Sequence, residues 1–285
     1  MPLRAKKPQD IKKRLKLFMY GPAKVGKTTA CIQFPNTYLI DTEDGAVNTK
    51  YVEILNKNNS AVFQTSDFDE MVKEINALLT EKHDYKTLVI DPLTIVYNDL
   101  IEKAEKKVGS EYGRHYGEAN KQMKHLMNLL LRLDMNVIIT SHSKNEYGKD
   151  LCILGQTFDC YKKLDYLFDL ILEIKKQGDS RYAYIKGSRL IGFQESATFE
   201  FSYEEMTKRH GKEIIEKQST PEILASKEQV QEINNFIKLL SIPDETIVKW
   251  LKKAKANDFY EMNQLDIQKC IDHLKSKITT TNEEH

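Results

Sequence analysis

One stretch constrains the fold of this chain more than any other, because it fixes how a strand and a helix must be joined. It reads Gly21, Pro22, Ala23, Lys24, Val25, Gly26, Lys27 and Thr28, and it fits the pattern of a glycine, four residues of any type, Gly-Lys and then Ser or Thr. An apolar run at residues 15–20 precedes it and predicts a buried strand, and the residues that follow predict a helix. Strand, glycine loop and helix in this order are typical of α/β proteins, so we expect that fold class.

This loop pattern has a specific chemistry. The backbone N–H groups of a glycine-permitted loop point inward and hold phosphate oxygens, and the positive end of the helix dipole assists them. We expect a nucleotide-binding segment that runs from Gly21 to Thr29, with Lys27 reaching the β- and γ-phosphates and the Thr28 hydroxyl ligating Mg²⁺. The predicted cofactors are therefore ATP and Mg²⁺. A chance match is the alternative, and the flanking strand and helix argue against it.

Composition narrows the class of protein. The chain has 285 residues, enough for about two domains, and 40% of them are hydrophobic, as in soluble globular proteins. The net charge of +1 means that affinity for a polyanion must come from local patches. No apolar run is long enough to span a bilayer, so we expect a cytoplasmic protein with no membrane partner. Four scattered cysteines without metal-ligand spacing exclude a disulfide scaffold and a zinc finger.

Short apolar runs alternate with helical patterns along the first two thirds of the chain. The runs that predict strands are residues 15–20, 37–41, 61–65, 87–91, 136–141, 168–174 and 181–185. Helices are expected at residues 67–79, where Asp67 and Glu70 form a capping box, and at residues 119–133. This alternation predicts a mostly parallel, doubly wound sheet with helices on both faces.

The pattern changes after Tyr203, where the strand signals stop and three helical stretches follow. They begin at Ser226, near Pro243 and after Asn263. We therefore expect a basic N-terminal tail at residues 1–14, a core at 15–205, a linker at 206–220 and a small all-helical domain at 221–285.

The apolar strand at residues 87–91 ends in Asp91. A phosphate-binding loop of this pattern, called a P-loop, needs an acidic partner that holds the water shell of the metal. We therefore expect Thr28 and Asp91 to hold Mg²⁺, the latter through water. The alternative is an ordinary aspartate that caps the helix after Pro92.

Two further strand ends carry polar residues that are expected to face the γ-phosphate. Residues 37–41 lead into an acidic cluster in which Glu43 is the candidate general base, because its longer side chain spans the gap better than that of Asp41. Residues 136–141 lead to the candidate sensor of the γ-phosphate, which is His142 or Ser141. The alternatives are a solvated acidic turn for Glu43 and an ordinary polar turn for the sensor.

Together these segments resemble a known family. GPAKVGKTT, YLIDTEDG, TLVIDPLT and NVIITSHSK, in this order, are similar to the RecA-like core, and specifically to phage-encoded RecA-like P-loop ATPases linked to single-strand annealing and recombination. The resemblance covers roughly residues 15–203. It implies a homo-oligomer with ATP at the subunit interfaces, and a basic pair, Lys186 and Arg189, that reaches the neighbour's γ-phosphate. A solvated hairpin is the alternative for this pair.

The resemblance also implies two DNA-facing loops. The first, at residues 106–117, is punctuated by glycine and interleaves cations with tyrosines, which suits phosphate neutralisation and stacking on unpaired bases. The second, at residues 144–158, directly follows the candidate sensor. Both are alternatively unliganded surface loops. The candidate DNA-binding residues are Lys106, Lys107, Tyr112, Arg114, Tyr116 and Lys144.

The leading hypothesis is a Mg²⁺-dependent ATPase that binds single-stranded DNA, is stimulated by it and promotes annealing or strand exchange. A protein partner for the C-terminal helices is a further expectation. The alternatives are an annealing or loading factor that ATP switches with negligible hydrolysis, and a P-loop kinase, which the lack of an arginine-rich lid disfavours. The predicted catalytic residues are Lys27, Glu43, Asp91, His142, Lys186 and Arg189.

Overall fold

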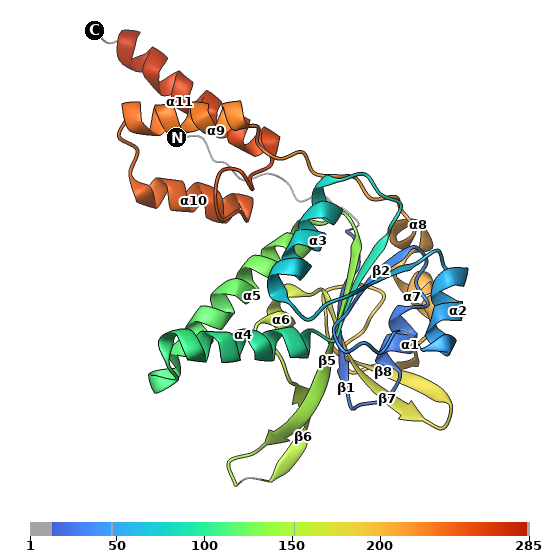
Figure 1. Ribbon diagram of the computed structural model, residues 1–285. Helices are drawn as coiled ribbons and strands as arrows, with labels where there is room; N and C mark the ends of the chain where they lie inside the picture. The colour runs from blue at the N-terminus through green and yellow to red at the C-terminus, as the bar shows by residue number, and fades with distance from the viewer. Residues whose placement is uncertain (1–12, 47, 151, 284–285) are drawn as a thin grey trace. The chain divides into compact units, whose positions relative to one another are not determined.

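The computed structural model describes residues 13–46, 48–150 and 152–283 (Figure 1). Of the basic tail expected at residues 1–14, all but Lys13 and Arg14 lie outside these described residues. Arg14 is buried, and its guanidinium donates to the carbonyl oxygens of Ile214, Lys217 and Gln218 at 2.7–3.1 Å. The end of the expected tail is thus fixed to residues about 200 positions further along the chain.

Within the described residues, the strands form one nine-stranded sheet in the order β3-β2-β4-β5-β1-β7-β8-β9, with β6 paired to β5. The first six strands of this order run parallel, while β8, β9 and β6 are antiparallel to their neighbours. The predicted α/β class with a mostly parallel sheet is confirmed. The strands are β1 (Lys16–Gly21), β2 (Thr37–Asp41), β3 (Ala61–Gln64), β4 (Thr87–Asp91), β5 (Asn136–Tyr147), β6 (Ile153–Phe158), β7 (Leu170–Gln177), β8 (Ser180–Ser188) and β9 (Thr198–Glu200).

The helices follow the apolar periodicity of the sequence. Asp67 caps α3 by accepting from the backbone N–H groups of Asp69 and Glu70, and Ser226 and Gln229 form a full capping box on α9. The predicted C-terminal helices are confirmed. The helices are α1 (Lys27–Cys31), α2 (Thr49–Lys57), α3 (Phe68–Thr80), α4 (Leu93–Val108), the 3₁₀ turn η1 (Glu111–Gly113), α5 (Arg114–Arg132), α6 (Leu164–Leu167), α7 (Tyr203–His210), α8 (Lys212–Ile215), α9 (Lys227–Leu239), α10 (Asp244–Ala254) and α11 (Gln264–Glu283).

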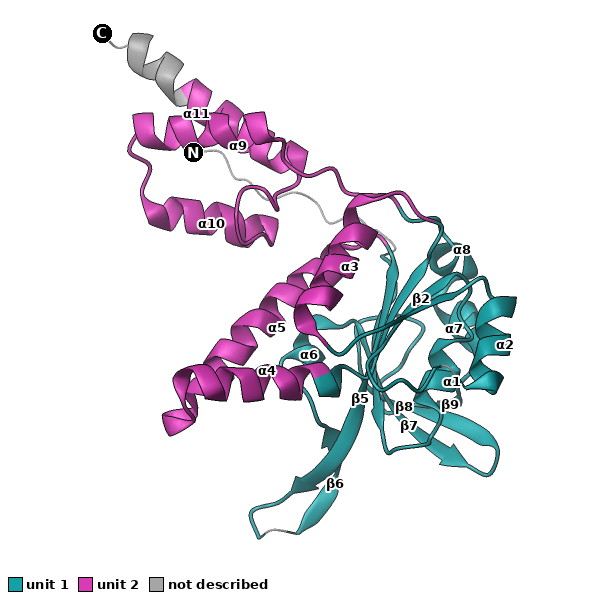
Figure 2. Ribbon diagram, in the orientation of Figure 1, with its two compact units in different colours: residues 1–66, 84–95, 135–219 teal, residues 67–83, 96–134, 220–285 magenta. Residues whose placement is uncertain are grey.

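The chain divides into two compact units (Figure 2). Unit 1 comprises residues 1–66, 84–95 and 135–219 and holds the sheet. Its main core packs the buried side chains of β1, β7 and β8 against α1, α2, α7 and α8. One face of the sheet is therefore covered by helices from both ends of unit 1.

Unit 2 comprises residues 67–83, 96–134 and 220–285, which include α3, α5, most of α4 and the C-terminal helices. The C-terminal helices have a core of their own around Ile233, Ile267 and Ile271. Arg132 of α5 connects them to the rest of the unit: its Nε donates to Glu222 Oε2 at 3.0 Å and its Nη2 donates to the Glu261 carbonyl oxygen at 2.6 Å.

The structure corrects three details of the expected layout. Residues 206–220, expected as a linker, include the end of α7 and all of α8, and Met206 and Ile215 belong to the core of unit 1. Residues 144–158, expected as a loop, form a hairpin, because β5 runs on to Tyr147 and pairs with β6. Residues 106–117, also expected as a loop, are the end of α4, η1 and the first turn of α5. Within the described ranges, no helix is both long and apolar enough to cross a membrane.

Candidate nucleotide-binding site

The loop between β1 and α1 is held in a conformation that requires its two glycines. A Cβ on Gly21 would lie 2.5 Å from the carbonyl oxygen of Ile174 in β7, which is too close for any side chain. Gly26 has a φ of +96°, in the left-handed region that favours glycine, and a Cβ there would lie 1.9 Å from Nε of Arg181. The two glycines of the sequence pattern are thus required because a carbonyl oxygen of β7 and an arginine side chain of β8 lie against the loop.

Lys27 fills the interior of this loop. Its side chain is 8% exposed, and Nζ donates to the carbonyl oxygens of Gly21 at 2.9 Å and Pro22 at 3.0 Å. Burial lowers the pKa of Lys27, and the nearby carboxylates of Asp91 and Glu43 partly oppose that shift. The ammonium group therefore lies inside the loop that is predicted to hold phosphates.

Thr28 and Asp91, the two residues predicted to hold Mg²⁺, are in contact. The Thr28 hydroxyl donates to Asp91 Oδ2 at 2.5 Å, and the Thr140 hydroxyl donates to the other carboxylate oxygen. Burial raises the pKa of Asp91, while these two hydrogen bonds and Lys27 lower it. A hydroxyl and a carboxylate are hard oxygen donors of the kind Mg²⁺ takes, usually with several waters, so the residues present fit that ion.

Glu43 and His142 meet at the carboxyl ends of β2 and β5. Glu43 Oε1 lies 3.0 Å from His142 Nε2, and both side chains are partly exposed. Asp41, by contrast, accepts hydrogen bonds from the backbone N–H groups of Glu43 at 3.2 Å and Ala46 at 2.7 Å. Asp41 thus holds the turn, and Glu43 is left to present its carboxylate.

The hydroxyl of Ser141, the other candidate sensor, is used in hydrogen bonds within the protein. It is fully buried, and its hydroxyl donates to the carbonyl oxygen of His142 at 2.8 Å and accepts from Thr94 Oγ1 at 3.2 Å. Of the two candidates, His142 is the one that reaches the acidic cluster.

The basic pair expected to act on a neighbouring subunit makes contacts in its own chain. Lys186 Nζ lies 3.6 Å from Glu173 Oε2, and Lys175 Nζ lies 3.1 Å from Glu173 Oε1. Glu173 is only 4% exposed, so the two lysines neutralise a buried carboxylate. Arg189 donates to the Tyr166 carbonyl oxygen at 2.8 Å. The trans roles of Lys186 and Arg189 stay predictions.

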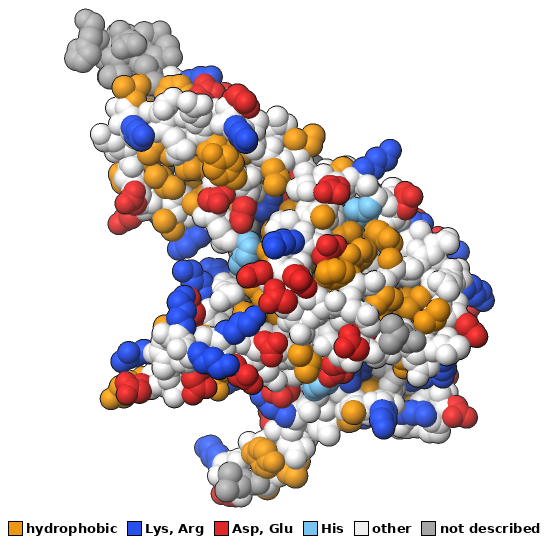
Figure 3. Space-filling model, in the orientation of Figure 1, with side chains coloured by type: hydrophobic (Ala, Val, Ile, Leu, Met, Phe, Trp, Pro, Cys, Tyr) orange, Lys and Arg blue, Asp and Glu red, His pale blue; other side chains and the backbone are white. Residues whose placement is uncertain are grey.

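The candidate DNA-binding residues of the first segment lie at two helix ends. Lys106 and Lys107 are in the last turn of α4, and Arg114 and Tyr116 are in the first turn of α5. Between them Tyr112 has a φ of +53° and is 98% exposed. Lysine and arginine side chains gather over α4 and α5 in Figure 3.

Some of these cations already have acidic neighbours. Lys107 Nζ lies 2.7 Å from Glu118 Oε1, and Arg114 Nη2 lies 3.8 Å from Glu111 Oε2. Lys144, in β5 of unit 1, pairs with Asp159 at 2.8 Å. DNA binding by any of these residues stays a prediction.

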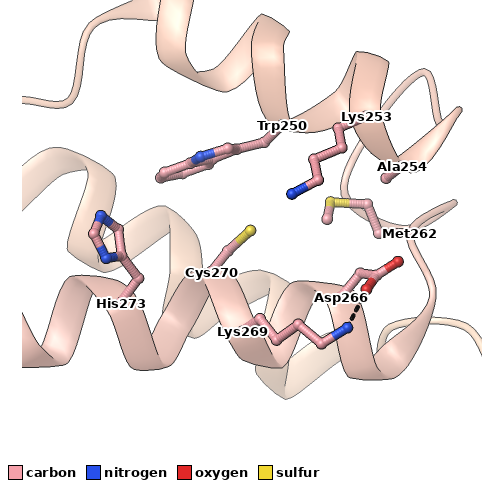
Figure 4. A pocket seen from close by; sticks show the side chains of 8 residues that line it. All are labelled: Trp250, Lys253, Ala254, Met262, Asp266, Lys269, Cys270 and His273. Carbon is pink, nitrogen blue, oxygen red and sulfur yellow. Dashed lines mark hydrogen bonds and ion pairs between the residues drawn. The ribbon is translucent and has the colours of Figure 1, made fainter. Parts of the chain in front are cut away.

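The C-terminal helices enclose a groove of about 270 Å³ (Figure 4). Trp250 and Met262 form its apolar part, and Lys253, Lys269 and His273 lie around it. Lys269 is tied to Asp266 at 2.7 Å. A protein partner for these helices stays a prediction.

Sequence reasoning missed Arg181, which lies against the P-loop. No motif marks it, because its place depends on how β8 aligns with β7 and β1. The only available signal was its position two residues before Ala183 in an alternating strand pattern.

Comparison with known proteins places this geometry in a family. A family model described as AAA domain matches residues 13–200. The crystal structure of the RadB recombinase is similar, with a TM-score of 0.45 and 20% sequence identity over 67% of this chain and 88% of that one. A search of curated proteins found no match. With its P-loop in unit 1 and most of its length matched, the chain belongs to the AAA domain family.

Proposed function

We propose that this protein binds and hydrolyses ATP in a Mg²⁺-dependent manner at the loop between β1 and α1. The observation that carries the proposal is the contact of Thr28 with Asp91 beside the buried ammonium of Lys27. A cation with a hydroxyl and carboxylate pair beside it supports a site for phosphates and Mg²⁺. The family match to an AAA domain supports it.

The residues have distinct roles in this proposal. Lys27 exchanges its bonds to the Gly21 and Pro22 carbonyls for bonds to phosphate oxygens, and Thr28 and Asp91 hold Mg²⁺. Bound Mg²⁺ would neutralise phosphate charge. Glu43 orients the attacking water, and His142, which pairs with Glu43, registers the γ-phosphate. Because Glu43 and His142 are already in contact, a change at either one is transmitted to the other.

Equilibrium titration with a fluorescent ATP analogue, with and without Mg²⁺, tests the first half of this proposal. Saturable binding that Mg²⁺ strengthens is expected for the wild type. Absence of such binding contradicts the proposal. Phosphate release, measured with and without single-stranded DNA at low salt, tests hydrolysis and its stimulation.

Single-stranded DNA is the nucleic acid that we propose as partner. The support is the segment around Tyr112, a fully exposed tyrosine between two lysines at the end of α4 and the pair Arg114 and Tyr116. An exposed aromatic ring offers a stacking platform worth about 1–3 kcal/mol per base, and cations nearby bind the phosphates. The proposed outcome of binding is annealing or strand exchange.

A Tyr112→Ala variant tests this partner. We expect DNA affinity to fall by about tenfold or more, since stacking on the ring is lost. Tyr260→Ala, which removes another exposed tyrosine of unit 2, is the matched control and should bind DNA like the wild type. Arg114→Gln should reduce the salt dependence of binding. Unchanged affinity in Tyr112→Ala would remove this segment from the DNA interface.

A second candidate function is an ATP-switched annealing or loading factor with negligible hydrolysis. It is favoured by one observation, the 3.0 Å contact in which Glu43 Oε1 is already engaged by His142 Nε2. Equal turnover of the wild type and Glu43→Gln would support this second candidate.

A further inference from the structure

Arg181 reaches the P-loop because of the alternation of side chains along β8. Ala183 and Ile185 point into the core that also contains Ala30 and Cys31 of α1. Arg181 precedes Ala183 by two residues and therefore leaves the sheet on the same face. Its backbone is fixed by pairing with Lys176 of β7 and by its carbonyl oxygen, which accepts from the Phe201 N–H at 2.7 Å.

The guanidinium group lies directly against Gly26. A Cβ on Gly26 would be 1.9 Å from Arg181 Nε, 2.7 Å from Cδ and 2.9 Å from Cζ. The arginine therefore uses the space that every other amino acid would fill at this position of the loop.

No protein group satisfies this guanidinium among the described residues. Its Nε is buried without a hydrogen-bond partner, and no ion pair joins it to a carboxylate in the part of the chain that the structure describes. Every other described arginine has a partner: Arg14, Arg114, Arg132, Arg189 and Arg209 bond to carbonyl oxygens or carboxylates. The side chain as a whole is partly exposed, but a buried N–H group without an acceptor destabilises the fold, so an anion is expected to supply the missing bond.

We propose that Arg181 is a phosphate-binding residue of the nucleotide site, supplied by the same subunit. Its N–H groups donate to phosphate oxygens of the nucleotide that the P-loop holds. The planar fork of a guanidinium suits phosphate oxygens better than any neutral side chain does. This inference deepens the proposed function and rests on it, because it requires a phosphate-bearing ligand at this loop.

Arg181→Gln, made in the full chain, tests the inference. Binding of the fluorescent ATP analogue is measured directly, and inorganic tripolyphosphate, which has no base or ribose, is measured as a competitor. We expect about tenfold weaker binding of both ligands, since a hydrogen bond to a charged group is lost. Lys176→Gln is the control, because it removes an exposed cation from the strand position opposite Arg181 and should bind like the wild type.

The outcomes separate the possible failures. If the wild type binds neither ATP nor tripolyphosphate, the proposed function fails and this inference fails with it. If the wild type binds both and Arg181→Gln binds equally well, only the role of Arg181 is overturned. Weaker binding of ATP alone, with tripolyphosphate unaffected, also overturns the assignment to phosphate. Arg181→Lys, which keeps the charge, should recover part of the affinity and guards against a folding defect in the Gln variant.

Discussion

Gly26→Ala is the substitution for which the structure predicts the most specific result. The new methyl group would lie 1.9 Å from Arg181 Nε, so the guanidinium must leave its place against the loop. Because Gly26 has a φ of +96°, the alanine is also strained by about 1–2 kcal/mol. Two losses follow: the free energy of unfolding falls by that strain, and nucleotide affinity falls by at least the tenfold expected for Arg181→Gln.

Gly178→Ala is the control that isolates the strain. Gly178 has a φ of +59° in the turn between β7 and β8, and a Cβ there would meet no atom within 4 Å. This variant should lose about 1 kcal/mol of stability from its backbone alone and keep full nucleotide affinity. Urea unfolding measures the first quantity, and titration with the fluorescent ATP analogue measures the second.

A variant that carries both Gly26→Ala and Arg181→Gln completes a double-mutant cycle. If Gly26→Ala acts by displacing Arg181, then adding Arg181→Gln should weaken binding by much less than the tenfold that it causes alone, because the contact is already lost. Full additivity of the two effects, or wild-type affinity in Gly26→Ala, would refute the reasoning.

Three further predictions concern other contacts. Glu43→Gln should keep ATP affinity and lower turnover by about 10²–10⁴-fold, since general base assistance is removed; steady-state phosphate release checks this. Lys27→Met should abolish ATP binding while changing the free energy of unfolding little at neutral pH. Burial lowers the pKa of Lys27 in the folded state. The free energy of unfolding of the wild type therefore increases as the pH rises from that lowered value to the ordinary lysine range. Urea unfolding across this pH range should show no such increase in the Met variant. Arg132→Met should destabilise the protein by about 3 kcal/mol in urea unfolding without affecting ATP affinity, because Glu222 at 3.0 Å is left as an unpaired, largely buried charge.

The sequence could predict those parts of the molecule that depend on patterns of neighbouring residues along the chain. Strand β2 was expected at residues 37–41 and strand β4 at residues 87–91, and both are found there, because each is a short apolar run that ends in a polar residue. The approach of Thr28 to Asp91 also follows from local rules, since parallel strands present their carboxyl ends at one edge of the sheet.

The parts that sequence reasoning missed depend on contacts between distant segments. Arg181 meets Gly26 only because β8 pairs with β7, which in turn pairs with β1. The hairpin of β5 and β6 carries many polar residues, so its alternation gave no apolar signal for strands. Residues 106–117 contain three glycines, which favour a loop, yet Arg114 already belongs to α5. The buried side chains of that helix at helical spacing, such as Met123 and Leu126, explain the longer helix.

The pairing of Lys186 with buried Glu173 has a consequence for assembly. If Lys186 swings toward a neighbouring subunit, Lys175 alone remains beside a carboxylate that is 4% exposed. Leaving the Glu173 carboxylate with one cation carries an electrostatic penalty. We expect this penalty to be offset only when the Lys186 ammonium group binds a triphosphate. If Lys186 takes the trans role predicted for it, we expect subunits that carry nucleotide to associate more readily than empty ones.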